Sequence, residues 1–156
     1  MKKEYISQLT MDAFYKDILR QMAQDRYKPD IVVGLLRGGA EMAIKFSHYL
    51  NVPCEVFKWQ LRDGEVSDSC IAQVDTFFKN NLNKDILVVD DIFDTGESLR
   101  AFDDVAKVQP LTGLITYAVC IENVAEDSPT IDYSARQINR TDEDQWFVFP
   151  CEEWWY

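Results

Sequence analysis

Apolar positions along the chain follow two different spacings, and their alternation predicts the order of the structural elements. From Met11 to Met22 apolar residues recur at intervals of three and four, which is the spacing of a helix with one buried face. Residues 30–36, DIVVGLL, form a short β-branched run typical of a buried strand. Residues 40–50 return to the helical spacing.

The rest of the chain repeats this alternation. Further helices are predicted at residues 71–80 and 98–107, and further strands at residues 54–57, 85–90, 113–120, 130–135 and 146–149. Strands that alternate with helices predict an α/β fold with a mostly parallel sheet flanked by helices. No linker or repeat divides the 156 residues, so we expect a single domain over residues 1–156.

Two unusual segments directly follow buried strands. Residues 37–39 read Arg-Gly-Gly, and residues 90–98 read DDIFDTGES, with three carboxylates close together. Ligands of open parallel sheets bind beyond the carboxyl ends of the strands. The two segments are therefore predicted to line one binding site.

Composition narrows the kinds of partner and compartment. The net charge of −11 argues against nucleic acid, because basic side chains supply most of that affinity. No apolar run approaches the roughly 18 residues of a membrane span, and charges interrupt the N-terminal segment, so we expect no membrane partner and a cytoplasmic location. The single histidine, His48, is expected to have a surface or packing role. No metal-site spacing links the cysteines, which are expected to be mostly buried free thiols: Cys54, Cys70, Cys120 and Cys151.

The acidic segment has the chemistry of a sugar-phosphate site. Backbone N–H groups and hydroxyls of residues 95–98 can hold a phosphate at the start of a helix. Asp90 and Asp91 can accept hydrogen bonds from a vicinal diol, directly or through Mg²⁺. Asp94 is then placed for proton transfer, and the whole describes a ribose 5-phosphate with a reactive centre. The simpler alternative is a solvated acidic turn with a Thr/Ser helix cap.

Residues 86–99, ILVVDDIFDTGESL, resemble the signature of type I phosphoribosyltransferases that binds 5-phosphoribosyl 1-diphosphate (PRPP). Every position of that signature is filled. The resemblance implies the type I fold, with a small hood built from the chain termini. It also implies that Asp90 and Asp91 hold the ribose hydroxyls and that Asp91 influences the placement of Mg²⁺. The residues implied to enclose the 5-phosphate are Asp94, Thr95, Gly96, Glu97 and Ser98.

Two other segments resemble the same family. Residues 32–43, VVGLLRGGAEMA, are similar to its pyrophosphate loop, which implies that Leu36, Arg37 and Gly38 lie at the pyrophosphate. A non-proline cis peptide is expected there, between Leu36 and Arg37. The polar stretch at residues 58–69 is similar to the mobile loop that closes over the reacting centre. Lys58 and Arg62 are its candidates for phosphate contacts.

The C-terminal segment resembles the base-binding part of small xanthine-guanine and hypoxanthine transferases. By this resemblance Trp146 stacks on a purine, the backbone of Phe147 reads the purine 2-position edge, and Glu152 is in register with an acid of that group. Asp94 sits where purine-type members carry the acid that handles the N7 proton. Packing or subunit contacts are expected for Trp154, Trp155 and Tyr156. Members of the family commonly form dimers, so the resemblance implies a homodimer or a higher homo-oligomer.

The implied activity is a Mg²⁺-dependent transfer of the phosphoribosyl group from PRPP to hypoxanthine, guanine or xanthine. This is a purine-salvage reaction of nucleotide metabolism. One position departs from the pattern: purine members usually carry a lysine just after the strand at residues 113–120, and none lies near Cys120. Two alternatives therefore stay open, namely a PRPP-binding regulatory protein and a transferase of this fold that acts on a non-purine acceptor.

Overall fold

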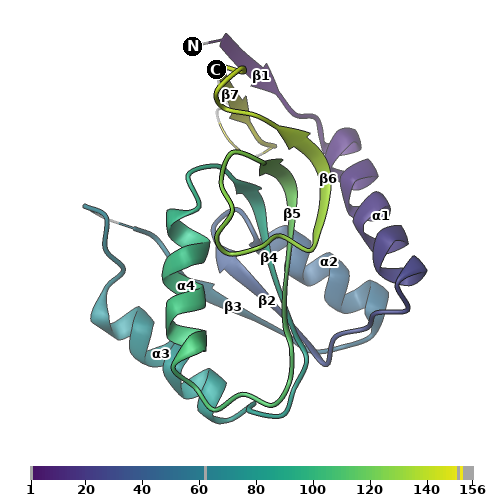
Figure 1. The fold of residues 1–156 in the computed structure, drawn as a ribbon. Coiled ribbons are helices and arrows are strands. Elements are labelled where there is room, and N and C mark those ends of the chain that lie inside the picture. Colours follow the sequence, from purple (N-terminus) through teal and green to yellow (C-terminus); the bar gives the residue numbers. More distant parts are fainter. Residues whose placement is uncertain (1, 62, 151, 153–156) are drawn as a thin grey trace.

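The computed structural model describes residues 2–61, 63–150 and 152, which contain seven strands and four helices (Figure 1). In chain order the elements are β1 Lys2–Tyr5, α1 Gln8–Gln24, β2 Ile31–Leu36, α2 Ala40–Leu50, β3 Cys54–Lys58, α3 Asp68–Lys79, β4 Ile86–Phe93, α4 Glu97–Lys107, β5 Ile115–Asn123, β6 Tyr133–Ile138 and β7 Gln145–Val148.

Five parallel strands form the main sheet in the order β3-β2-β4-β5-β6. Helices α1 and α2 pack on one face, and α3 and α4 cover the other, so two hydrophobic cores lie on opposite sides of the sheet (Figure 1). The central strands β2 and β4 are near-continuous apolar runs because both of their faces are buried. The predicted α/β architecture is confirmed.

Capping and helical spacing explain why the helices form where they do. The Ser7 side chain accepts a hydrogen bond from the Thr10 N–H and begins α1, whose buried face carries Met11, Tyr15, Ile18 and Met22. Ser67 caps α3 in the same way through the Cys70 N–H, so this helix begins at Asp68 and not at the predicted residue 71.

Several predicted strand boundaries were wrong. Strand β4 continues through Asp90 and Asp91 to Phe93, because it goes on pairing with β5 after its apolar run ends. Strand β5 extends beyond the predicted end at Cys120 to Asn123, and β6 occupies Tyr133–Ile138 where residues 130–135 were expected.

The two ends of the described chain form a second, smaller sheet above the main one (Figure 1). Strands β1 and β7 pair in parallel, with Lys2 opposite Gln145 and Tyr5 opposite Val148. We call this pair of strands the hood. It confirms the expectation of a hood built from the chain termini.

The predictions for the cysteines were only partly correct. Cys120 is a buried free thiol, but Cys54 and Cys70 are free and only partly buried, and Cys151 lies outside the described residues. His48 is exposed on α2, as expected for a residue without a catalytic partner. No helix in the described ranges is both long and apolar enough to cross a membrane.

Candidate functional site

A crevice forms where β2 and β4 part at their carboxyl ends. Their pairing stops at Gly34 and Val89, after which β2 follows β3 up to Leu36 and β4 follows β5 up to Phe93. From this point the connection after β2 runs to one side of the sheet and the connection after β4 runs to the other. Open α/β sheets bind ligands at the point where the strand order reverses in this way. Both segments singled out in the sequence, residues 37–39 and 90–98, lie at this crevice.

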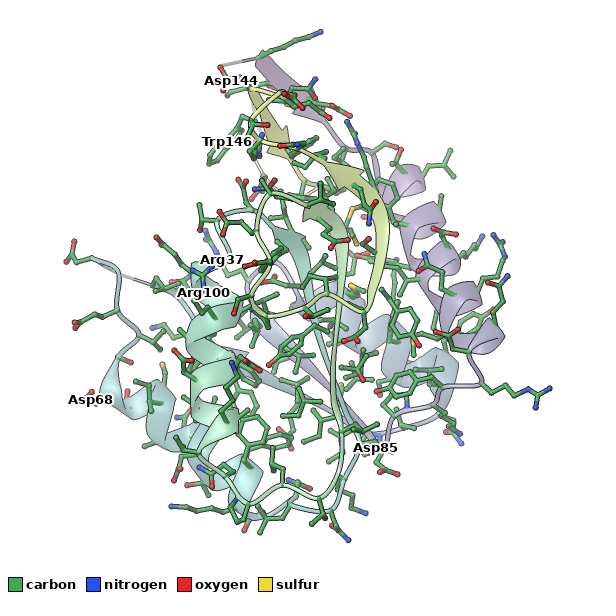
Figure 2. All side chains as sticks on the ribbon, viewed as in Figure 1. Arg37, Asp68, Asp85, Arg100, Asp144 and Trp146 are labelled. Carbon is green, nitrogen blue, oxygen red and sulfur yellow. The ribbon has the colours of Figure 1, made fainter. Side chains whose placement is uncertain are left out.

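Glycines allow the two segments to touch. A Cβ atom added to Gly38 would collide with the carboxylate of Asp91, and one added to Gly39 would collide with the backbone oxygen of Val89. The peptide bond between Leu36 and Arg37 is cis, as predicted. Arg37 is exposed, and Figure 2 shows it near the upper end of α4, where Arg100 also lies.

Asp90 and Asp91 form a crowded acidic pair at the end of β4. The Asp91 N–H donates to Oδ1 of Asp90 at 3.0 Å. Burial, together with the neighbouring charge of Asp91, raises the pKa of Asp90 well above its usual range. Burial also raises the pKa of Asp91 to about 6, and the charge of Glu152 adds to this effect. The pair is therefore suited to hydroxyl donors or to a cation that offsets its charge.

The acidic pair fits Mg²⁺ that arrives with a phosphorylated substrate. No group of three or more acid, histidine or cysteine side chains in the described ranges can hold a metal by itself. Mg²⁺, however, is commonly bound by one or two carboxylates, with substrate phosphates and water completing its octahedral shell. The two carboxylates at the end of β4 match that donor set.

The turn from β4 into α4 has the geometry of an anion cradle. Gly96 adopts a left-handed conformation with φ of 75° and caps the helix. A Cβ atom at this position would lie 2.9 Å from Nη2 of Arg100 and 3.1 Å from the ring of Phe93. The first N–H groups of a helix have no partner within it, so they are available to a phosphate. Residues 95–98 supply these groups beside the acidic pair.

Asp94 is held by an arginine that the sequence analysis did not single out. Arg140 donates from Nε to Oδ1 of Asp94 at 2.7 Å and from Nη2 to Oδ2 at 3.0 Å. Asn123 fixes both residues, because its Nδ2 donates to the backbone oxygen of Asp94 at 2.8 Å and its Oδ1 accepts the Arg140 N–H at 3.1 Å. The end of β5 thus positions the acid and its cation together.

Arg140 also joins Asp94 to the hood. Its Nη1 donates to the backbone oxygen of Gln145, and its guanidinium lies over the ring of Phe147, 5.3 Å from the centroid. The backbone groups of successive residues in a strand point to opposite edges of that strand. The backbone oxygen of Val148 in β7 points toward β1, because it accepts the N–H of Ile6, the residue after β1. Gln145 and Phe147 therefore present their backbone groups on the other edge of β7, which Arg140 contacts.

The aromatic residues of the hood differ in exposure. Trp146 is 53% exposed, whereas Phe147 is buried. Figure 2 shows Trp146 on the hood above Arg37. The Glu152 carboxylate accepts the Phe149 N–H at 2.9 Å, so it is engaged by the backbone of its own segment. Trp154, Trp155 and Tyr156 lie outside the described residues.

The lysine that purine members usually carry is missing near Cys120. The side chain of Cys120 is buried in the core with its sulfur 4.0 Å from that of Met42, and burial raises the pKa of the thiol. The strand ends at Asn123, which is the residue that faces Asp94 and Arg140. A polar residue at the carboxyl end of a buried strand was the available signal for Asn123.

The expected loop at residues 58–69 is anchored at its start and not polar throughout. Lys58 is the last residue of β3 and is exposed, whereas Trp59 is buried and donates from Nε1 to the backbone oxygen of Ser98 at 2.9 Å. This bond ties the loop to the first turn of α4. Arg62 lies outside the described residues.

Comparisons with known proteins agree with this geometry. A family model described as the phosphoribosyl transferase domain matches residues 7–153. No curated protein matches the sequence. Among solved structures, a purine phosphoribosyltransferase from Pyrococcus horikoshii superposes with a TM-score of 0.73 at 23% identity, covering 99% of this chain and 96% of that one. A xanthine-guanine-hypoxanthine phosphoribosyltransferase from Helicobacter pylori gives a TM-score of 0.67 at 17% identity over 97% and 94%. A Neisseria gonorrhoeae protein with bound ppGpp gives a TM-score of 0.72 at 17% identity over 98% and 90%.

Proposed function

The chain belongs to the phosphoribosyltransferase family, and we propose that it transfers the phosphoribosyl group of PRPP to a purine base and releases pyrophosphate. The observation that carries the purine assignment is the position of Asp94. This acid lies between the phosphate cradle and the hood, and Arg140 connects it to the backbone edge of β7. The names of the Pyrococcus horikoshii and Helicobacter pylori structures support the same substrate class. We further propose that the whole chain acts as one domain.

The central part of the chain binds PRPP in this proposal. Asp90 and Asp91 accept hydrogen bonds from the ribose hydroxyls, which relieves the crowding of two buried carboxyls. The N–H groups of residues 95–98 hold the 5-phosphate, and the exposed Arg37 lies beside the pyrophosphate with Leu36 and Gly38. Asp91, together with the substrate, would hold Mg²⁺, which would supply positive charge to offset that of the leaving pyrophosphate.

The hood and Asp94 bind the base. The bond between C1 of the ribose and the pyrophosphate oxygen breaks as the bond between C1 and N9 of the base forms. The base loses one proton in this exchange, and Asp94 accepts it from N7. An ionised carboxylate has about four acceptor sites, so two remain after Arg140 has bound. Trp146 stacks on the ring, the Phe147 backbone faces its 2-position edge, and Glu152 orients the segment that follows β7.

Pyrophosphate release with a panel of bases tests the proposal. The protein is incubated with PRPP and Mg²⁺, and with hypoxanthine, guanine, xanthine, adenine or orotate in separate reactions. We expect release with at least one purine and none without a base. Release with orotate alone would assign a pyrimidine acceptor, and PRPP binding without release from any base would assign a regulatory role. Either result contradicts the proposal.

A further inference from the structure

We propose that Arg140 recognises the base and selects 6-oxopurines over 6-aminopurines. The inference rests on the proposed purine transfer and adds the chemical class of the base. Its starting point is the ion pair in which both oxygens of Asp94 are bound by one guanidinium, at 2.7 and 3.0 Å.

The chemistry of a purine places its 6-substituent next to Arg140. N7 and the 6-substituent are neighbours on one edge of the base. If Asp94 accepts the proton of N7, the position of N7 is fixed beside Asp94. The neighbouring 6-substituent then faces whichever group is hydrogen-bonded to Asp94 on the side of the hood. Arg140 is that group, because its guanidinium extends from Asp94 to the backbone oxygen of Gln145 in β7.

The donors of Arg140 set the direction of the selectivity. A guanidinium has five N–H groups and no acceptor. Within the described ranges three of them are used, two by Asp94 and one by Gln145, which leaves two for a ligand. A 6-oxo group accepts such a bond, whereas the amino group of adenine is itself a donor. A base with an amino group at this position would leave donors facing each other without an acceptor.

Arg140 is held in one arrangement, so it does not easily turn away from the wrong base. Its backbone N–H is bound by Asn123, its side chain is 22% exposed, and its guanidinium lies over the ring of Phe147. Sites with fixed hydrogen-bonding groups reject a base that cannot pair with them more strongly than apolar pockets do.

Arg136 provides a matched control. It also forms a two-bond ion pair and also lies over Phe147, at 5.1 Å, but its partner is Glu4 of β1 and not Asp94. Loss of Arg136 therefore removes a comparable charge and ring contact without removing the donors beside Asp94.

The experiment compares Arg140→Met, Arg140→Lys and Arg136→Met with the wild type. The measured quantities are kcat/KM for hypoxanthine and adenine from pyrophosphate release, and the affinities for the products IMP and AMP by calorimetry. The wild type is expected to favour hypoxanthine, and Arg140→Met to lower the hypoxanthine-to-adenine ratio by about 100-fold or more, chiefly through hypoxanthine. Arg140→Lys should restore part of the ratio, because an ammonium still donates. Arg136→Met should change both bases by a similar factor.

The outcomes separate this inference from the proposed function. A wild type that favours adenine, or a ratio that Arg140→Met and Arg140→Lys leave unchanged while PRPP still binds, overturns the role of Arg140 and leaves purine transfer standing. A wild type that uses no purine overturns both. If Arg140→Met fails to bind PRPP, the test rests on Arg140→Lys. Its hypoxanthine-to-adenine ratio of kcat/KM and its relative affinities for IMP and AMP are then compared with those of the wild type.

Discussion

Asp94 shares its two carboxylate oxygens with one guanidinium and still has acceptor sites for a proton. The neighbouring acids Asp90 and Asp91 lack such a partner among the described residues, and burial raises the pKa of both. Three carboxylates that are close together in the sequence thus have two different electrostatic environments. One is charge-compensated by the protein, and the other two are suited to compensation by a ligand.

The first prediction concerns Asp94 itself. Asp94→Asn should lower kcat by about 100-fold or more, because an amide cannot accept the base proton, and general acid–base groups typically contribute that much. PRPP affinity, measured by calorimetry, should change little because the acidic pair and residues 95–98 remain. Asp104→Asn, at an exposed position of α4, is the matched control and should keep full turnover. Unchanged turnover in Asp94→Asn would refute its role as the proton acceptor.

The second prediction concerns the pH dependence of stability in cation-free buffer. The folded state raises the pKa of Asp91 from 3.8 to about 6, so the folded protein binds this proton more tightly than the unfolded chain does. Ionisation of Asp91 therefore destabilises the fold as pH rises through the window from about 4 to about 6. Asp91→Asn should gain stability over the wild type across that window, by at most about 3 kcal/mol.

Denaturant unfolding of both proteins at a series of pH values measures this difference. Asp85→Asn, which removes one carboxylate outside the crevice at the opposite end of β4, is the control for the change in net charge. A constant difference between Asp91→Asn and the wild type at all pH values would mean that burial does not oppose the charge of Asp91. PRPP affinity should fall in Asp91→Asn even where the protein is more stable.

Sequence alone predicted only those residues of the site that lie close together in the chain. The acids and the glycine of residues 90–98 lie close together in the chain, so their pattern reveals their chemistry without a structure. Arg140 is 46 positions from Asp94, and the sequence analysis assigned it no role. Its partner is set by how β5 and the hood pack, and no spacing in the sequence contains that information.

At the scale of elements, the start of α4 depends on one glycine. Gly96 combines a φ of 75° with close neighbours on Arg100 and Phe93. The third prediction is that Gly96→Ala costs more than Gly64→Ala, which has a similar φ of 81° but open space around the added Cβ. The strain of a left-handed alanine is about 1 kcal/mol in both variants, and the contacts at Gly96 add to it.

Denaturant unfolding and PRPP affinity together check this prediction. Gly96→Ala should weaken PRPP binding because the N–H groups of residues 95–98 shift, whereas a shift at Gly64 leaves the cradle intact. Equal losses of stability in the two variants, with PRPP binding unaffected, would show that the contacts at Gly96 relax without cost.

The buried elements were predictable because their apolar spacing is strong. Strand β2, helix α2 and the apolar part of β4 lie where the sequence placed them, since each buries an apolar run or face against the sheet. Strand β1, with the sequence KKEY, was not predicted because most of its side chains are exposed and it carries no apolar pattern. It becomes a strand only through pairing with β7, a partner from the other end of the described chain.

The whole molecule consists of a sheet with two cores and a hood that an ion pair fastens to it. Arg136 of β6 donates to Glu4 of β1 at 2.5 and 3.2 Å, and both side chains are about one-third exposed (31% and 34%). The guanidinium lowers the pKa of Glu4 through its hydrogen bond. Stability from this pair is therefore present at neutral pH and is lost as pH falls through the pKa of folded Glu4.

The fourth prediction tests this connection by a double-mutant cycle. Glu4→Gln, Arg136→Gln and the double variant should give a coupling free energy of about 0.5–1 kcal/mol at neutral pH, since the pair is partly exposed. Unfolding in denaturant at neutral pH and at a pH of about 3 provides the measurement, and the coupling should be smaller at the lower pH. Coupling that is the same at both pH values would show that the charge of Glu4 does not hold the hood.

The pairing of β1 with β7 also determines when the binding site is completed during synthesis. A ribosome makes the chain from its N-terminus, so β1 is made first and cannot pair with β7 until every strand of the main sheet has been made. The residues of the crevice and of the turn into α4 are made before the segment that carries Arg140 and Trp146. The nascent protein should therefore gain affinity for the sugar phosphate first and for the base last, when β7 closes the hood over β1.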